Sequence, residues 1–382
     1  MKITPMRKWF WMVFAGIGVA AALAGEEKII RHPDPGEPLA QRWEWAMQTA
    51  GQKTDFWIGY SIRRVMGEDS HIGSFHYPPR EGDMVLQELI YGSETPPGQP
   101  QLSEEEELRR AAERALGEAK KQKAPENKVL KEVAFLFRIH AGARPASILR
   151  EVHVSNLSLA VDLNSLPLYW LNGAENGQSL TLLQNLFEKE SSAPDRDELV
   201  AAAGLHDDPV LVIPVLQQML NEKNGREIRE DALFWLGQQD HPQALEILLK
   251  TLRDDGSEEI CEEAVFAVSR MELPEATAAL VELARQSNRP EVREEAVFWL
   301  GQKASREAAA ALDEIAHGDE EELQERAVFA LAELPDGAGI PRLIAIAKTH
   351  HNPAIRKKAI FWLSQSEDER AVDAIIELAG GK

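Results

Sequence analysis

The sequence predicts a mainly α-helical protein in which a helical solenoid follows a small α+β domain. An eleven-residue phrase recurs five times in the C-terminal half, at a spacing of 31 or 32 residues. A second apolar stretch follows each copy, and the region before the phrases contains runs that alternate with a period of two. A fixed period of this length is typical of stacked repeats, because one unit cannot bury its apolar face alone.

Each phrase has the pattern of a helix. In the first copy, Ile228, Ala232 and Leu236 share one face at 100° per residue, together with Trp235. Short breaks containing Pro, Gly or Asp lead to second apolar stretches such as PQALEILLKTL and RAVDAIIELA. A fainter copy over Asp197–Leu220 gives about six helical hairpins in a domain of residues 191–382. The copies are IREDALFWLGQ from Ile228, ICEEAVFAVSR from Ile260, VREEAVFWLGQ from Val292, LQERAVFALAE from Leu323 and IRKKAIFWLSQ from Ile355.

The phrase VREEAVFWLG resembles the V-R-x-x-A-x-x-x-L-G core of bacterial short HEAT repeats, the type also found in phycobilisome lyases. The resemblance covers about half of the chain and implies a HEAT/armadillo-like α-solenoid. It also implies that Arg229, Arg293 and Arg356 bond carbonyls or acids in the adjoining layer. Fold alone does not fix function, since such arrays serve many tasks.

The resemblance further implies a partner-binding concave surface lined by the second helices. Acids outnumber bases on this expected surface, which favours a basic protein or peptide as partner. The residues expected there are Glu246, Lys250, Glu282, Glu314, Arg342, Asp373 and Glu377.

A phenylalanine recurs at the seventh position of every phrase, away from the predicted core stripe. Either each ring packs against the next repeat or the first domain, or the rings form an exposed apolar seam on the convex side that serves as an interface. The residue after each phenylalanine alternates between Trp and Ala, which favours interdigitated packing. The five candidates are Phe234, Phe266, Phe298, Phe329 and Phe361.

The N-terminus has the pattern of a secretory signal peptide over residues 1–24. Lys2, Arg7 and Lys8 precede an apolar run, and Ala22-Leu23-Ala24 gives an A-x-A cleavage pattern. We therefore expect a periplasmic or secreted protein without stable membrane insertion after cleavage; an uncleaved N-terminal anchor is the alternative. Residues 25–37 are rich in Pro and charge and predict a linker.

Residues 38–190 predict an α+β domain of no recognised family. Helices are expected over Pro38–Gly51, Ser103–Lys123 and Ser179–Lys189. Phe56–Val65 predicts a strand, and further strands are expected between Val133 and Trp170, separated by turn signals that include Asn172-Gly173 and Asn176-Gly177.

The chain is acidic, with a formal net charge of −21. From Pro194 to Lys382 it has 20 basic and 38 acidic residues, a net charge of −18, so most of the acidity lies in the repeats. This charge opposes binding to nucleic-acid phosphates and attracts basic partners.

No HExxH, CxxC, P-loop or GxSxG motif is present in the sequence, so no catalytic residue, metal or cofactor is expected. The sequence favours a non-catalytic interaction scaffold in the bacterial cell envelope. The alternative is an envelope enzyme with catalysis in residues 38–190 and the repeats as a recognition arm. For that alternative, the polar residues open as candidates are Glu68, Asp69, His71, His76, His140 and His153.

We expect the mature protein to begin at Gly25, because cleavage should follow the A-x-A pattern. N-terminal sequencing of protein from its native host measures this. Recovery of intact Met1 on a soluble cytosolic protein would contradict export.

Overall fold

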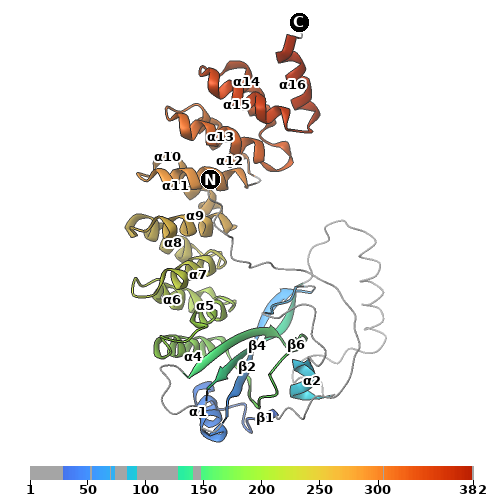
Figure 1. Cartoon of the computed structure of the whole chain (residues 1–382), viewed down its shortest axis with the longest axis vertical. Helices are drawn as coiled ribbons and strands as arrows, with labels where there is room; N and C mark the ends of the chain where they lie inside the picture. The colour runs from blue at the N-terminus through green and yellow to red at the C-terminus, as the bar shows by residue number, and fades with distance from the viewer. Residues whose placement is uncertain are drawn as a thin grey trace, which may run out of the picture. The chain divides into compact units, whose positions relative to one another are not determined.

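The computed structural model describes residues 29–51, 54–68, 70–73, 84–92, 128–140, 148–303 and 305–380. The chain divides into two compact units, Met1–Ala202 and Ala203–Lys382 (Figure 1). The sequence-based boundary after residue 190 stays a prediction. The expected signal peptide and the expected Ser103–Lys123 helix lie outside the described residues. Within the described residues, no helix is long and apolar enough to cross a membrane.

The first unit is built on a five-stranded mixed sheet of order β1-β7-β2-β4-β5. β1 and β2 run parallel to β7, whereas β2–β4 and β4–β5 are antiparallel. β3 and β6 form a separate two-stranded pair. The strands of the first unit are β1 Ile29–Arg31, β2 Phe56–Gly67, β3 Met84–Val85, β4 Lys128–Ile139, β5 Leu149–Asn156, β6 Ala160–Val161 and β7 Leu168–Gly173. Its helices are α1 Leu39–Ala50, α2 Leu86–Tyr91, α4 Asn176–Lys189 and α5 Arg196–Gly204.

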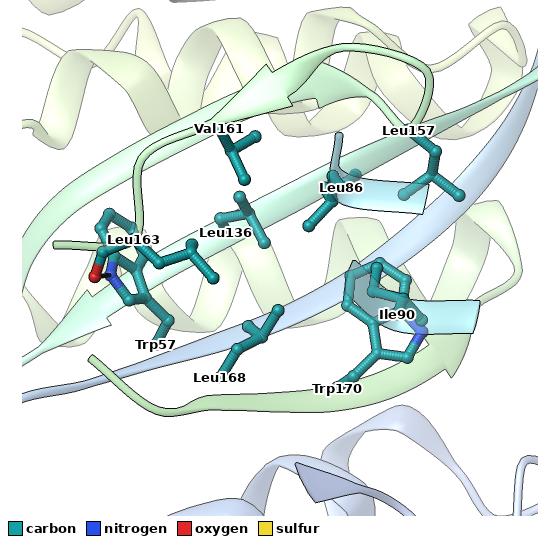
Figure 2. Close-up of a cluster of buried hydrophobic side chains, with 10 residues drawn as sticks. Trp57, Leu86, Ile90, Leu136, Leu157, Val161, Leu163, Leu168 and Trp170 are labelled. Carbon is teal, nitrogen blue, oxygen red and sulfur yellow. Dashed lines mark hydrogen bonds between the residues drawn. The ribbon is translucent and has the colours of Figure 1, made fainter. Parts of the chain in front are cut away.

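Both faces of the central strands are buried, so β4 is apolar at successive positions rather than only at alternate ones. On one face, Trp57 and Trp170 lie in a cluster with Leu86 and Ile90 of α2 (Figure 2). The indole N–H of Trp57 donates to the Leu163 carbonyl at 3.0 Å, which satisfies the buried polar group.

The opposite face of the sheet packs on α1 and α4. The ring of Phe137 lies 5.3 Å from that of Trp43 on α1, and the Tyr60 hydroxyl is hydrogen-bonded to Ser179 on α4 at 2.8 Å. Buried Arg42 of α1 donates to the carbonyls of Leu171 and Gly173 at the end of β7. These contacts tie the helices to the sheet.

Three local features differ from the sequence expectations. Ile29–Arg31, inside the stretch interpreted as a linker, forms β1 and pairs with β7. Asn176-Gly177, interpreted as a turn signal, begins α4. The six-residue α2 was not expected, because LQELIY is too short to show a helical period. The expected helix at Pro38–Gly51 and the expected strand at Phe56–Val65 are confirmed as α1 and β2.

The second unit is a stack of helix pairs (Figure 1). We call the five helices that carry the repeated phrase the signature helices; each is followed by a second helix. The signature helices are α7 Arg226–Gly237, α9 Glu258–Arg270, α11 Pro290–Gly301, α13 Glu321–Glu333 and α15 Pro353–Ser364. The other helices are α6 Pro209–Met219, α8 Pro242–Asp254, α10 Pro274–Gln286, α12 Arg306–Ala316, the 3₁₀ turn η1 Pro335–Gly337, α14 Ile340–Thr349 and α16 Glu369–Gly380.

Neighbouring signature helices approach closely at the tenth phrase position where that residue is glycine, as in α7 and α11. A Cβ atom at Gly237 would lie 2.6 Å from the Ala267 carbonyl oxygen, and one at Gly301 would lie 2.9 Å from the Ala330 Cα. Neither glycine has a positive φ, so the requirement here is space rather than backbone freedom. Small residues on both sides of the contact therefore set the helix spacing.

In three of the five signature helices, the second phrase position is an arginine that joins the helix to the backbone just before it, as expected from the sequence. Arg229, Arg293 and Arg356 donate to the carbonyls of Leu220, Ser287 and His350, at 3.1, 2.8 and 2.6 Å. Arg229 also pairs with Asp255 in the following loop. Although burial opposes it, the hydrogen bond from the Ser257 N–H and the Arg229 guanidinium lower the pKa of Asp255.

We expect Gly237→Ala to lower the free energy of unfolding by about 1–3 kcal/mol, because the new methyl group meets the Ala267 backbone. Gly256→Ala is the matched control, since a Cβ atom there meets nothing within 4 Å. Chemical denaturation measures both. Equal stability of the two variants would contradict the close helix contact.

Candidate functional site: the faces of the solenoid

The residues expected to bind a partner through the second helices lie on consecutive helices of the second unit. Glu246 and Lys250 are on α8, Glu282 on α10 and Glu314 on α12, and all four are exposed. Arg342 on α14 is half-buried, whereas Asp373 and Glu377 on α16 are exposed. The structure therefore leaves these side chains accessible, and their role in binding stays a prediction.

Two of these acids are already paired with bases of the preceding second helix. Glu314 pairs with Arg285 of α10, and the Lys348 ammonium lies 2.6 Å from Glu377. Exposed ion pairs of this kind contribute about 0–1 kcal/mol, so they leave the acids available to a competing basic group.

The five phenylalanines and the tryptophans of neighbouring layers form two groups of ring contacts, one in α7, α9 and α11 and one in α13 and α15; together we call them the aromatic ladder. The ring of Phe266 lies 6.4 Å from that of Phe234 and 4.8 Å from that of Trp299. Phe329 lies 4.9 Å from Trp362 in the same way. Core packing was expected for these tryptophans, and the contacts of Trp299 and Trp362 with the phenylalanine of the preceding signature helix were not predicted.

Exposure along this aromatic ladder is uneven. Phe298 and Phe361 are 39% and 52% exposed, whereas Phe234, Phe266 and Phe329 are partly buried. The two alternatives drawn from the sequence therefore describe different members of the ladder: some rings extend the core, and others are open to solvent.

Charged side chains of neighbouring signature helices also contact each other at regular phrase positions, and we call this pattern the charged register. The fourth phrase position of α13, Arg326, pairs with the third position of α11, Glu294, at 2.5 Å. Lys358 of α15 pairs with Glu325 of α13 at 3.1 Å in the same register. The fourth position of one helix thus contacts the third position of the helix before it.

In the first three signature helices, the same register brings together acids. Glu263 of α9 faces Glu230 of α7, and Glu295 of α11 faces Glu262 of α9, because these residues hold the fourth and third phrase positions. Burial and the neighbouring carboxylates of Glu230, Asp231 and Glu295 raise the pKa of Glu263 to about 7.

The pKa of Glu263 in the folded chain lies above its ordinary value of 4.5, so the folded state favours the protonated carboxyl. This contribution to stability is present at acidic pH and is lost as pH rises from about 4.5 through about 7. At neutral pH and above, the contact between Glu263 and its neighbouring acids therefore lowers the free energy of unfolding. Burial and the Glu295 carboxylate also raise the pKa of Glu262.

Two of the histidine candidates of the first unit, His140 and His153, lie in a network of polar contacts on neighbouring strands. His140 Nδ1 is 2.9 Å from Asp55 Oδ1, and His153 Nε2 is 3.4 Å from Glu151 Oε2. Arg138 joins the two pairs, with contacts of 3.5 Å to Asp55 and 2.6 Å to Glu151. The candidates Asp69 and His76 lie outside the described residues. In the parts of the chain that the structure describes, no group of three metal-ligating side chains is present.

We expect Phe266→Ala to cost more stability than Phe361→Ala. Phe266 lies between two other rings, whereas Phe361 is 52% exposed. Truncation of a buried Phe costs about 3–5 kcal/mol, so we expect about 2 kcal/mol for the partly buried Phe266 and under about 1 kcal/mol for Phe361. Thermal unfolding of both variants measures the difference. A larger loss for Phe361→Ala would contradict the assignment of Phe266 to the core.

Comparisons with known proteins agree with this architecture. A family model for HEAT repeats matches residues 213–301 and 308–382. No curated protein sequence matches the chain. Human deoxyhypusine hydroxylase in complex with glycerol is similar at 24% identity, over 53% of this chain and 78% of that chain, with a TM-score of 0.25.

Two further solved structures are similar to part of the chain. The complex of CpcE and CpcF of phycocyanin lyase from a Nostoc species is 20% identical over 41% of this chain and 99% of that chain, with a TM-score of 0.30. A designed armadillo repeat protein in complex with the peptide (KR)4 is 22% identical over 53% of this chain and 100% of that chain, with a TM-score of 0.27. Residues 213–301 and 308–382 are HEAT repeats, and they form a stack of helix pairs that follows a small sheet-containing region in the chain.

Proposed function

We propose that this chain is a non-catalytic scaffold whose HEAT solenoid binds a basic protein or peptide. The observation that carries the proposal is the exposure of acidic side chains on successive second helices, which gives one partner several equivalent contacts. The residues concerned are Glu246 on α8, Glu282 on α10, Glu314 on α12, and Asp373 and Glu377 on α16.

The overall charge of the repeats supports the same choice of partner. The net charge of −18 from Pro194 to Lys382 attracts basic molecules and accelerates their association. The same field repels phosphate groups, so we do not propose nucleic acid as a partner.

We propose the bacterial cell envelope, periplasmic or secreted, as the location of this scaffold. The proposal rests on the order of positive residues, apolar run and A-x-A pattern in residues 1–24.

The alternative function is an enzyme with catalysis in residues 38–190. The observation that favours it is the network in which Arg138 joins the pairs His140–Asp55 and His153–Glu151. The same arrangement is that of ion pairs that hold neighbouring strands together, so we place this alternative second.

We expect the full chain to bind a Lys- and Arg-rich peptide with an affinity that falls as ionic strength rises, because exposed charges are screened. Changing Glu246, Glu282, Glu314 and Glu377 together to Lys should weaken binding by at least about tenfold while the melting temperature changes little. Fluorescence anisotropy and thermal unfolding measure the two effects.

The matched control places the same substitution at four exposed acids outside the second helices, Glu222, Asp319, Glu333 and Glu367. Both variants change the net charge equally. An equal loss of affinity in the two variants would show that the total charge, rather than the second-helix face, determines binding.

A further inference from the structure

The signature helices α7, α9 and α11 carry aromatic rings and acids on neighbouring positions. We call this surface the aromatic–acidic face. The phenylalanines hold the seventh phrase position, one helical turn after the fourth position held by Asp231, Glu263 and Glu295. The face consists of Phe234, Phe266, Phe298 and Trp299 with Glu230, Asp231, Glu262, Glu263 and Glu295.

Contacts in the later repeats show which kind of side chain pairs with an acid at the third phrase position. At α13 and α15, the fourth phrase position is a base, and it pairs with the acid at the third position of the preceding helix. Arg326 and Lys358 thus show that a cationic side chain can be accommodated between two adjacent signature helices.

At α9 and α11, the fourth position is an acid instead. Burial and the three neighbouring carboxylates of Glu230, Asp231 and Glu295 all raise the pKa of Glu263. Among the described residues, no base forms an ion pair with Glu263. Arg226 is taken up by Glu230, at 3.3 Å, and by Glu259, at 3.4 Å.

Within the described residues, Glu295, unlike Glu263, has a base close to it. Its carboxylate accepts a hydrogen bond from the Trp299 indole N–H at 2.7 Å, and Arg326 of α13 attracts it. The missing positive charge is therefore centred on Glu263, between α7 and α11.

Aromatic rings beside the register favour an organic cation over a small ion. Phe266 lies between the rings of Phe234 and Trp299, and Phe298 is 39% exposed and 5.0 Å from Trp299. Guanidinium and ammonium groups are attracted to ring faces and to carboxylates together, and their alkyl stems pack on apolar surface.

We propose that the aromatic–acidic face of α7, α9 and α11 is an interaction surface for a basic peptide segment. One of its Arg or Lys side chains lies beside Glu263 and Glu230 and supplies the positive charge that Arg326 and Lys358 supply in the later repeats. This proposal deepens the proposed function and rests on it. The second helices then attract the partner over a distance, and the Glu263 register anchors it.

The test measures binding of a fluorescent octa-arginine peptide to the full chain at about pH 8, where Glu263 is ionised. We expect Glu263→Gln to weaken binding about tenfold, which corresponds to the loss of one charge-assisted contact. Glu367→Gln, which removes one exposed acid outside both the second helices and the aromatic–acidic face, should change binding less than about twofold. Unfolding of both variants confirms that the fold is intact.

The pH dependence gives a second readout. The ionised fraction of Glu263 falls about tenfold between about pH 8 and about pH 6. Because the uncharged form still binds about tenfold more weakly, the affinity of the parent protein should fall about fivefold over this range. The groups that face Glu263 are Glu230 and Asp231 of α7 and Glu295 of α11, and octa-arginine has no side chain that titrates in this range. Glu263→Gln should remove most of this pH dependence.

The outcomes separate this inference from the proposed function. If the parent protein does not bind octa-arginine, both are overturned. If it binds in a salt-sensitive way but the two single variants bind equally, the proposed function stands and the aromatic–acidic face is not the anchor. If millimolar Ca²⁺ displaces the peptide as completely in the parent protein as Glu263→Gln weakens it, the face is a cation site and the peptide assignment is wrong.

Discussion

Signature helices meet at Gly237 and Gly301 with no room for a Cβ atom, and this contact fixes the offset between α7 and α9 and between α11 and α13. Once the spacing is fixed, every position of the phrase stacks on a defined position of the neighbouring copy. The arginine–carbonyl contacts, the aromatic ladder and the charged register all follow from that one offset. Nearest-neighbour interfaces of this kind determine the stability of solenoids, since distant repeats do not touch.

The charged register shows how one backbone geometry supports two opposite arrangements. In α13 and α15, Arg326 and Lys358 complete the contact within the chain. In α9, Glu263 leaves the same contact between like charges, which costs stability at neutral pH. A region that is less stable than its neighbours at the same position is a common property of binding surfaces.

The solenoid was predictable from sequence because its spacing and helical period are repeated five times. The short elements of the first unit were not: β1 has three residues and gains its identity only from pairing with β7, far along the chain. The phenylalanines of the candidate site could be named from the sequence, but their contacts with side chains of neighbouring helices could not. Sequence placed Phe266 and Trp299 on separate faces, yet they contact because they come from adjacent helices. The offset between helices, which no single repeat encodes, also decides that Glu263 faces Glu230.

The alternation of large and small residues after each phenylalanine makes the repeats non-equivalent. Trp235, Trp299 and Trp362 are separated by Ala267 and Ala330, so each indole lies in a layer next to alanine layers. Loss or duplication of one repeat would bring two indoles, or two alanines, into adjacent layers and leave either an overlap or a void. Loss or duplication of two repeats would preserve the sequence of layers. The unit by which this array can grow or shrink is therefore a pair of hairpins, twice the period that the sequence displays.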